Sequence, residues 1–198
     1  MKYLKIDIAE PARSVIRETV LKLKKSQVIA LPTDTIYGFS ALITKKEAID
    51  KIYQIKQRDK KYALLILVNS LKMVKKYCQI STRQFNYLKT VWPGPVTVIL
   101  DIKPGKLRNI FTSDNSIAVR WPDNEYLQKL IKKTKTPLIS TSANITTKPV
   151  AQNGRDIINT WKNLENQPSL VIDGGNLDNK ASRIIDLRDI DNIKTIRE

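Results

Sequence analysis

The chain has 198 residues, 41% of them hydrophobic, and its 35 lysines and arginines outnumber its 19 acidic residues, giving a formal net charge of +16. It contains no histidine and a single cysteine, Cys78, which excludes histidine bases, histidine-ligated metals, internal disulfides and structural zinc sites. No apolar stretch approaches the ~20 residues that a membrane helix needs, and the length predicts one domain over residues 1–198.

Two properties of the sequence bear on location and partners. The first residues, MKYLKIDIAEPARS, lack the apolar core of a signal peptide, and together with the single cysteine they predict a cytoplasmic protein with no membrane attachment. The positive charge favours RNA, DNA or nucleotides as partners. Lysine-rich usage in an AT-rich genome would produce the same excess, so charge alone does not identify a partner.

Helical and strand patterns alternate along the first half of the chain. Apolar residues at helical spacing predict a helix over 11–25, with Pro11 in its first turn. We expect VIAL at 28–31 to be a buried strand, TKKE at 44–47 to be the capping box of a second helix, and ALLILV at 63–68 to be a strand buried on both faces. Two short helices with serine caps are predicted next, within 70–78 and 81–91.

The second half continues this alternation. Strands are predicted at 96–101, 116–120, 137–141, 169–173 and 182–187, with a further strand at 192–197, and helices at 123–133 and 155–165. Interleaved helices and strands favour an α/β or α+β fold with a largely buried mixed sheet. The hairpin-like spacing near the C-terminus argues against a purely parallel sheet.

Three polar clusters stand at or near the ends of predicted elements. They are PTDTIYG at 32–38, KQR at 56–58 and STSAN at 140–144. Open α/β sheets bind ligands at the carboxyl ends of their strands, so the clusters are candidates for one binding site. Lys56 offers a point charge and Arg58 a bidentate fork, which suits two phosphoryl groups of one polyanion. Each cluster alone is more readily explained by turn, cap or solvated helix-end residues, so their order and spacing carry the argument.

Taken together, the motifs resemble the YrdC/TsaC family of threonylcarbamoyl-AMP synthases. The resemblance covers nearly the whole chain through ALPTDTIYGF, IKQR before an apolar strand, WPGPVTVIL at 92–100, SIAVRWPDN at 116–124, ISTSAN at 139–144, VIDGG at 171–175 and a final strand with Arg197 near its end. It implies an open, twisted, mixed and mostly parallel sheet flanked by helices, with a positively charged concave face. The resemblance is to the short, single-domain form of the family, so we expect no further domain.

The resemblance implies a nucleotidyltransferase. It would make threonylcarbamoyl-AMP and pyrophosphate from L-threonine, bicarbonate and ATP, with Mg²⁺ held by the phosphates and no protein metal site. Downstream transferase proteins would then complete the threonylcarbamoyladenosine modification of tRNA, and tRNA or double-stranded RNA would lie on the basic face. Such a reaction needs positioning and fixed positive charge, and it does not need a histidine base.

The resemblance also implies roles for individual residues. The expected catalytic residues, which also bind ATP, are Lys56 and Arg58 of a K-x-R motif and Ser142 and Asn144 of an S-x-N motif, with Arg197 as a further ATP-binding residue. Arg120 matches the arginine of an AVR motif and is expected to hold the threonine carboxylate. The other expected threonine-binding residues are Thr33, Thr35, Tyr37, Ser140 and Ser182.

The sequence departs from the family pattern in several places. Asp59, Tyr62 and Ala63 follow the K-x-R motif where the family has proline, then histidine or lysine, then proline or glycine. Thr147 replaces a glycine, Arg183 a threonine and Asn124 a histidine. Two other hypotheses therefore stay open: a YrdC-like paralogue that binds RNA or nucleotide without making the adenylate, and a carbamoyl transferase with another acceptor. The lack of accessory zinc-finger or acylphosphatase-like segments argues against the latter.

Overall fold

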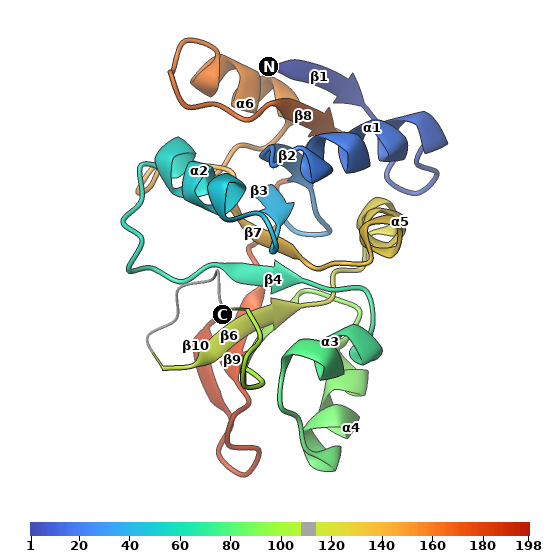
Figure 1. Ribbon diagram of the computed structural model, residues 1–198, viewed down its shortest axis with the longest axis vertical. Helices are drawn as coiled ribbons and strands as arrows, with labels where there is room; N and C mark the ends of the chain where they lie inside the picture. The colour runs from blue at the N-terminus through green and yellow to red at the C-terminus, as the bar shows by residue number, and fades with distance from the viewer. Residues whose placement is uncertain (108–113) are drawn as a thin grey trace.

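The computed structural model describes residues 1–107 and 114–198. Over these residues ten strands form one sheet in the order β1-β8-β2-β3-β7-β4-β6-β5-β9-β10 (Figure 1). The strands are β1 (Lys2–Lys5), β2 (Ile29–Pro32), β3 (Tyr37–Leu42), β4 (Leu65–Leu67), β5 (Val96–Asp101), β6 (Ser116–Arg120), β7 (Leu138–Ser142), β8 (Leu170–Asp173), β9 (Arg183–Asp186) and β10 (Lys194–Arg197). The helices are α1 (Arg13–Lys24), α2 (Lys46–Lys56), α3 (Leu71–Tyr77), α4 (Thr82–Val91), α5 (Glu125–Thr134) and α6 (Gly154–Trp161).

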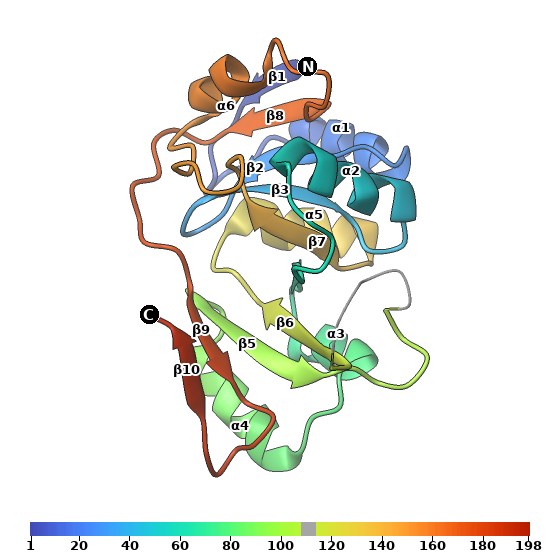
Figure 2. The ribbon, with the colours of Figure 1, turned by 90° about the vertical axis from the view of Figure 1, so that its left-hand side faces the viewer.

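The upper part of the sheet is buried on both faces. Successive strand residues point to opposite sides, so β2 contributes Ala30 to one hydrophobic core and Ile29 and Leu31 to the other. This explains the unbroken apolar run of β2. Helices α1 and α5 cover one face, and α2 and α6 cover the other, as Figure 2 shows with α2 in front of the sheet and α1 and α5 behind it. There Trp161 packs edge-on against Phe39, with 5.0 Å between the ring centroids.

The predicted mixed sheet flanked by helices is confirmed, but its predicted parallel majority is wrong. Of the nine strand pairings between described residues, four are parallel and five antiparallel. The main cause is β3, which the sequence did not predict. It folds back on β2 and then pairs antiparallel with β7. Its residues, YGFSAL, include glycine and serine, so the stretch lacks a clear strand pattern.

Most predicted elements are confirmed, and their ends differ by a few residues. Ser70 caps α3, and Ser81 and Gln84 form a capping box on α4. The capping box predicted at TKKE is wrong, because Lys45 occupies the cap position of α2 and makes no side-chain cap. Pro11 lies before α1, which begins only at Arg13. Strand β1 was not predicted. No helix of the described chain is long and apolar enough to cross a membrane.

Candidate functional site

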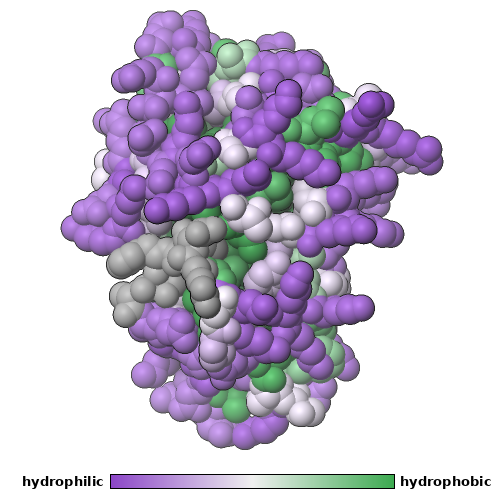
Figure 3. Space-filling view, viewed as in Figure 1, coloured by the Kyte–Doolittle hydropathy of each residue, from purple (hydrophilic) through white to green (hydrophobic). Residues whose placement is uncertain are grey.

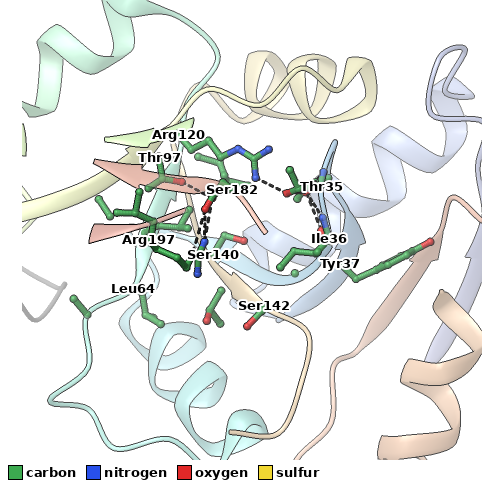
Figure 4. Close-up of a pocket in the computed structure, with 18 of the residues that line it drawn as sticks. Thr35, Ile36, Tyr37, Leu64, Thr97, Arg120, Ser140, Ser142, Ser182 and Arg197 are labelled. Carbon is green, nitrogen blue, oxygen red and sulfur yellow. Dashed lines mark hydrogen bonds between the residues drawn. The ribbon is translucent and has the colours of Figure 1, made fainter. Parts of the chain in front are cut away.

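A cavity of about 220 Å³ opens near the middle of the sheet, and elements far apart in the sequence supply its walls. Figure 4 shows the converging side chains: Thr35 from the β2–β3 turn, Arg120 from the end of β6, Ser140 and Ser142 from β7, Thr97 from β5, Ser182 from just before β9, and Arg197 from β10. Leu64 and other apolar residues complete the walls. The cavity therefore combines hydroxyl groups and cations with an apolar surface.

The turn between β2 and β3 is held by Thr33. Its hydroxyl oxygen accepts hydrogen bonds from the backbone N–H groups of Thr35 (3.0 Å) and Ile36 (3.1 Å), and its proton is donated to the Ile36 carbonyl (2.8 Å). These bonds use the single donor and both acceptor positions of a hydroxyl. Thr33 therefore serves mainly the turn, and its hydroxyl lies 3.0 Å from the Thr35 hydroxyl, which accepts a hydrogen bond from Arg120.

Arg120 is a buried cation that already has an anionic partner. It is 4% exposed, and its guanidinium donates to the Asp34 carboxylate at 2.7 Å, the Thr35 hydroxyl at 2.6 Å and the Gly94 carbonyl at 3.2 Å. Burial lowers the pKa of Arg120 from its ordinary value, and Asp34 opposes that shift. Because Asp34 balances the charge, this end of the cavity offers oriented donors without excess positive charge.

Lys56 does not line the cavity but contacts Ser142, which does. It is 2% exposed, and its ammonium donates to the carbonyl of Ser142 at 2.6 Å and to the carbonyl and side-chain oxygen of Asn144 at 3.0 and 2.8 Å. The Ser142 hydroxyl in turn donates to Asn144 Oδ1 at 2.7 Å. Burial, and secondarily the charge of Arg58, lowers the pKa of Lys56 to about 7. The predicted K-x-R and S-x-N motifs thus meet, with Lys56 positioning the loop after β7.

Arg58 reaches the cavity because the chain turns between it and Lys56. Gln57 ends α2 in the left-handed conformation, with φ of 51°, and this sends the two cations in different directions. Arg58 lines the cavity and contacts only neutral groups, the Thr141 hydroxyl at 3.5 Å and the Ala63 carbonyl at 3.3 Å. Among the described residues, no carboxylate lies within ion-pair distance of it.

The C-terminal strands bring a second uncompensated arginine. Arg197 donates to the Ser182 carbonyl at 2.6 Å, and the Ser182 hydroxyl lies 2.8 Å from the Thr97 hydroxyl. Ser182 and Thr97 are almost fully buried. Burial lowers the pKa of Arg197, and no carboxylate of the described chain pairs with it. Sequence reasoning missed Thr97, although it sits in the quoted WPGPVTVIL motif, because a threonine in a strand usually signals only strand propensity.

Two neighbouring strands press closely together at the cavity wall. Gly38 of β3 pairs with Ser142 of β7, and a Cβ at Gly38 would lie 3.0 Å from both the Ser140 hydroxyl and the Thr141 carbonyl. The Ser140 hydroxyl also accepts a hydrogen bond from Ser40 at 3.0 Å. The glycine therefore allows Ser140 to face the cavity beside the strand.

The Tyr37 side chain leads away from the cavity (Figure 4). Tyr37 is among the residues that line the wall, but its single hydroxyl proton is shared between Asp173 Oδ1 (3.0 Å) and the Gly175 carbonyl (2.7 Å), and its oxygen accepts from Gly174 N–H (2.9 Å). Asp173 also accepts hydrogen bonds from Tyr3 and from the Gly154 and Gly175 N–H groups. Tyr37 thus ties the start of β3 to the end of β8.

The structure gathers most of the predicted site residues. Nine of the eleven line the cavity: Thr33, Thr35, Tyr37, Arg58, Arg120, Ser140, Ser142, Ser182 and Arg197. The other two, Lys56 and Asn144, are bonded to Ser142 behind the wall. Besides Thr97, the sequence did not indicate the apolar wall residues Leu64, Leu67 and Ile184.

A family model described as "Telomere recombination", Sua5_yciO_yrdC, matches residues 22–198. The chain belongs to the Sua5/YciO/YrdC family. The predicted resemblance is thereby confirmed. The chain is 29% identical over 160 residues to the threonylcarbamoyl-AMP synthase of Bos taurus, covering 81% of this chain and 56% of the relative. To the synthase of Bacillus subtilis it is 28% identical over 162 residues, covering 81% and 46%. It therefore spans less than two thirds of these relatives.

Two solved structures of Sua5/YciO/YrdC proteins share the fold. E. coli YciO superimposes with a TM-score of 0.90 at 26% identity, covering 100% of this chain and 96% of that protein. P. abyssi Sua5, solved in complex with L-threonine, superimposes with a TM-score of 0.85 at 26% identity, covering 94% of this chain and 54% of that protein.

The departures from the family pattern mostly lie outside the cavity. Asp59 is exposed and pairs with Lys61 at 3.3 Å. Arg183 contacts the Thr195 hydroxyl at 2.9 Å on the C-terminal hairpin. Asn124 caps α5 through a 2.9 Å bond from Leu127 N–H. Thr147 has φ of 70°, where a glycine would be relaxed and a β-branched residue is strained.

Ala63 is a departure that lines the cavity, and Tyr62 precedes it. Tyr62 contacts Arg58 through its side chain. Its ring lies 5.3 Å from the Arg58 guanidinium carbon, its side chain is half exposed, and its carbonyl accepts a hydrogen bond from the Tyr53 hydroxyl at 3.0 Å. A tyrosine over an arginine forms a cation–π contact. In this structure Tyr62 therefore restrains Arg58 from outside the cavity.

Proposed function

We propose that the chain is a threonylcarbamoyl-AMP synthase, which converts L-threonine, bicarbonate and ATP into threonylcarbamoyl-AMP, pyrophosphate and water. The observation that carries this proposal is one cavity with a charge-balanced arginine, Arg120, and two uncompensated arginines, Arg58 and Arg197. A zwitterionic amino acid suits the first and a triphosphate the other two. Membership in a family with curated synthases supports the same reaction.

The cavity residues divide the work of binding. Arg120 and Thr35 would hold the threonine carboxylate, and Ser140 and Ser182 its amine and hydroxyl. Arg58 and Arg197, with Ser142, would hold the phosphates, while Lys56 and Asn144 keep Ser142 in place. An oxygen of threonine carbamate would then attack the α-phosphorus and expel pyrophosphate. The protein would contribute alignment and fixed positive charge.

Mg²⁺ would enter this site with ATP. The described residues that line the cavity carry hydroxyls and cations but no carboxylate, so phosphate oxygens and water would be its ligands, an arrangement that Mg²⁺ commonly adopts. The ion would neutralise phosphate charge and help to align the leaving group. We further propose that residues 1–198 act as one domain in the cytoplasm, with tRNA and threonylcarbamoyl transferase proteins downstream.

The deciding test is pyrophosphate release by the purified chain with ATP, Mg²⁺ and bicarbonate, with and without L-threonine. Release that requires both threonine and bicarbonate supports the synthase, and serine and valine test its selectivity. Mass spectrometry of the threonine-dependent adenylate identifies the product. A folded protein that binds ATP but releases no threonine-dependent pyrophosphate would contradict the proposal.

RNA or nucleotide binding without synthesis is the second candidate. It is favoured by the net charge of +16 and by the half-exposed Tyr62, whose ring lies beside Arg58 and Lys61, since exposed aromatic rings with flanking cations bind nucleobases. A pure binder would retain affinity for duplex RNA when Lys56→Ala and Arg58→Ala are combined, and would lose it steeply with salt. A synthase with the same two substitutions would lose turnover.

A further inference from the structure

An apolar groove runs between α1 and α5 on the face of the molecule away from α2. Its volume is about 740 Å³, and Ile16, Val20 and Leu21 of α1 form much of its floor. The Leu21 side chain is 49% exposed. In Figure 3 a green, hydrophobic area over these helices lies among purple, hydrophilic side chains. A single exposed leucine is ordinary on a protein surface, but this one lines a groove together with Ile16 and Val20.

Packing explains part of this apolar floor, because Ile16 belongs to the core beneath the groove and Val20 packs against it, but packing does not explain Leu21. The contact between α1 and α5 is already made by other residues: Leu23 and Leu130 are fully buried in the core beneath the groove, and the Thr19 hydroxyl lies 2.8 Å from the Tyr126 hydroxyl. Leu21 lies outside this core. Its exposed surface thus adds nothing to the fold and remains available to a partner.

Cations border the groove on both sides. Arg13, Arg17 and Lys24 line it from α1, and Lys129 and Lys133 line it from α5. None of the described residues that line the groove is acidic. Lys129 pairs with Glu125 at 3.1 Å, whereas the other four cations form no ion pair within the described chain. The groove thus combines an apolar floor with uncompensated positive borders.

We propose that this groove binds an acidic amphipathic helix of a partner protein. Arg13 and Arg17 are four residues apart, as are Lys129 and Lys133, so each pair presents two cations about 6 Å apart along its helix. A helix of about three turns matches the length of α1 and would place an apolar stripe on the floor and carboxylates against both borders. This interaction is separate from the proposed synthase reaction.

The charge and shape of the groove disfavour other occupants. A second copy would bring the same cations and repel them. Duplex RNA would satisfy the borders and leave the apolar floor uncovered. An acidic amphipathic helix satisfies both features at once.

A display library of helical peptides tests the proposal. Each peptide has fixed leucines at positions i, i+3, i+4 and i+7 and random residues elsewhere, and the full chain is the target. We expect selected peptides to be rich in Asp and Glu on both sides of the leucine stripe. Their affinity, from fluorescence anisotropy, should fall at least tenfold for Leu21→Asp and for combined Arg17→Glu and Lys133→Glu. Combined Lys51→Glu and Lys162→Glu, with the same charge change elsewhere, should change it less than threefold.

Several results would overturn the proposal. One is the absence of acidic enrichment, and another is an equal loss of affinity in the control variant, which would indicate general electrostatic attraction. Phosphatidylserine vesicles and a 16-base-pair RNA duplex are tested in the same way. If either binds in a Leu21-dependent manner and the peptides do not bind, the groove is a site for that ligand instead. A dimer in sedimentation equilibrium that Leu21→Asp dissociates would assign it to a second copy.

Discussion

The two groups of cations in the cavity differ in what surrounds them. Arg120 is buried and paired, with Asp34 2.7 Å away and side-chain exposures of 4% and 13% for the two residues. Among the described residues, the hydrogen-bond partners of Arg58 and Arg197 are hydroxyl and carbonyl oxygens, and Arg58 also lies against the Tyr62 ring. A neutral oxygen orients an arginine without cancelling its charge, whereas a carboxylate does both.

This difference separates folding from binding within one site. The charge of Arg120 is already neutralised by Asp34, so substitution of Arg120 should mainly lower stability. The charges of Arg58 and Arg197 remain available to an anionic ligand, so substitution of either arginine should mainly lower the affinity for that ligand. Site-directed variants can test this division.

Arg120→Met should have the largest effect. It would leave Asp34 buried without its cation, and breaking a buried pair in this way costs about 3–5 kcal/mol of unfolding free energy. Urea denaturation measures the loss. Combining Arg120→Met with Asp34→Asn removes both charges and should recover most of it. If Arg120→Met alone is as stable as the wild type, Arg120 is not the structural cation of the pair.

Arg58→Ala should behave in the opposite way. We expect a stability change within about 0.5 kcal/mol, because Arg58 is partly exposed and makes only long contacts. Threonine-dependent pyrophosphate release should fall at least a hundredfold in kcat/KM, or about 2.7 kcal/mol, because a fixed charge on the phosphates is lost. Lys51→Ala, at an exposed lysine of α2, the helix that precedes Arg58, is the control. Equal activity of the two variants would contradict the assignment of Arg58 to ATP.

The order of helices and strands could largely be predicted from the sequence. The parallel or antiparallel pairing of the strands could not be predicted as well. Strands such as β5 and β6 stand out because their apolar residues are bounded by polar ones. Strand β3 does not, since its buried residues include Gly38 and Ser40, whose burial depends on the neighbouring β7. Antiparallel pairing of β3 is a tertiary effect, which a local pattern cannot reveal.

The candidate site was predictable as a set of residues but not in their separate tasks. Motif order correctly brought together Arg58, Arg120 and Ser182 from distant parts of the chain. It could not show that Asp34 neutralises Arg120 or that the Thr33 hydroxyl is hydrogen-bonded within a turn. Nor could it show that the Thr97 hydroxyl contacts Ser182. These facts depend on distances between strands, and residue types alone do not specify them.

Tyr37→Phe sharpens the comparison, because Tyr37 was predicted to bind threonine. The hydroxyl instead bonds to Asp173 and to the backbone of Gly174 and Gly175. Its removal leaves buried partners unsatisfied and should cost about 2 kcal/mol of stability in urea denaturation. The KM for threonine should change less than threefold, whereas Thr35→Val should raise it more than tenfold. A large change in the KM for threonine in Tyr37→Phe would indicate that the Tyr37 hydroxyl contacts threonine after all.

Lys56 is intermediate between the two groups, since it is buried like Arg120 but has only neutral oxygen partners. Burial lowers its pKa in the folded chain to about 7, from 10.5 for a free lysine. Between these pH values the unfolded chain binds the additional proton, so the unfolding free energy should rise with pH. We expect a rise of roughly 1 kcal/mol between pH 7 and pH 8.

The measurement is urea denaturation at several pH values for the wild type and Lys56→Met. The variant is less stable at every pH, because oxygens of Ser142 and Asn144 lose their donor, so the slopes with pH are compared. Readings stay below pH 9, since burial also raises the pKa of Cys78 to about 12, and its thiol would lower stability above that pH. If the unfolding free energies of the wild type and Lys56→Met change equally with pH, Lys56 keeps its proton over this pH range. It would then be permanently charged, as the arginines are.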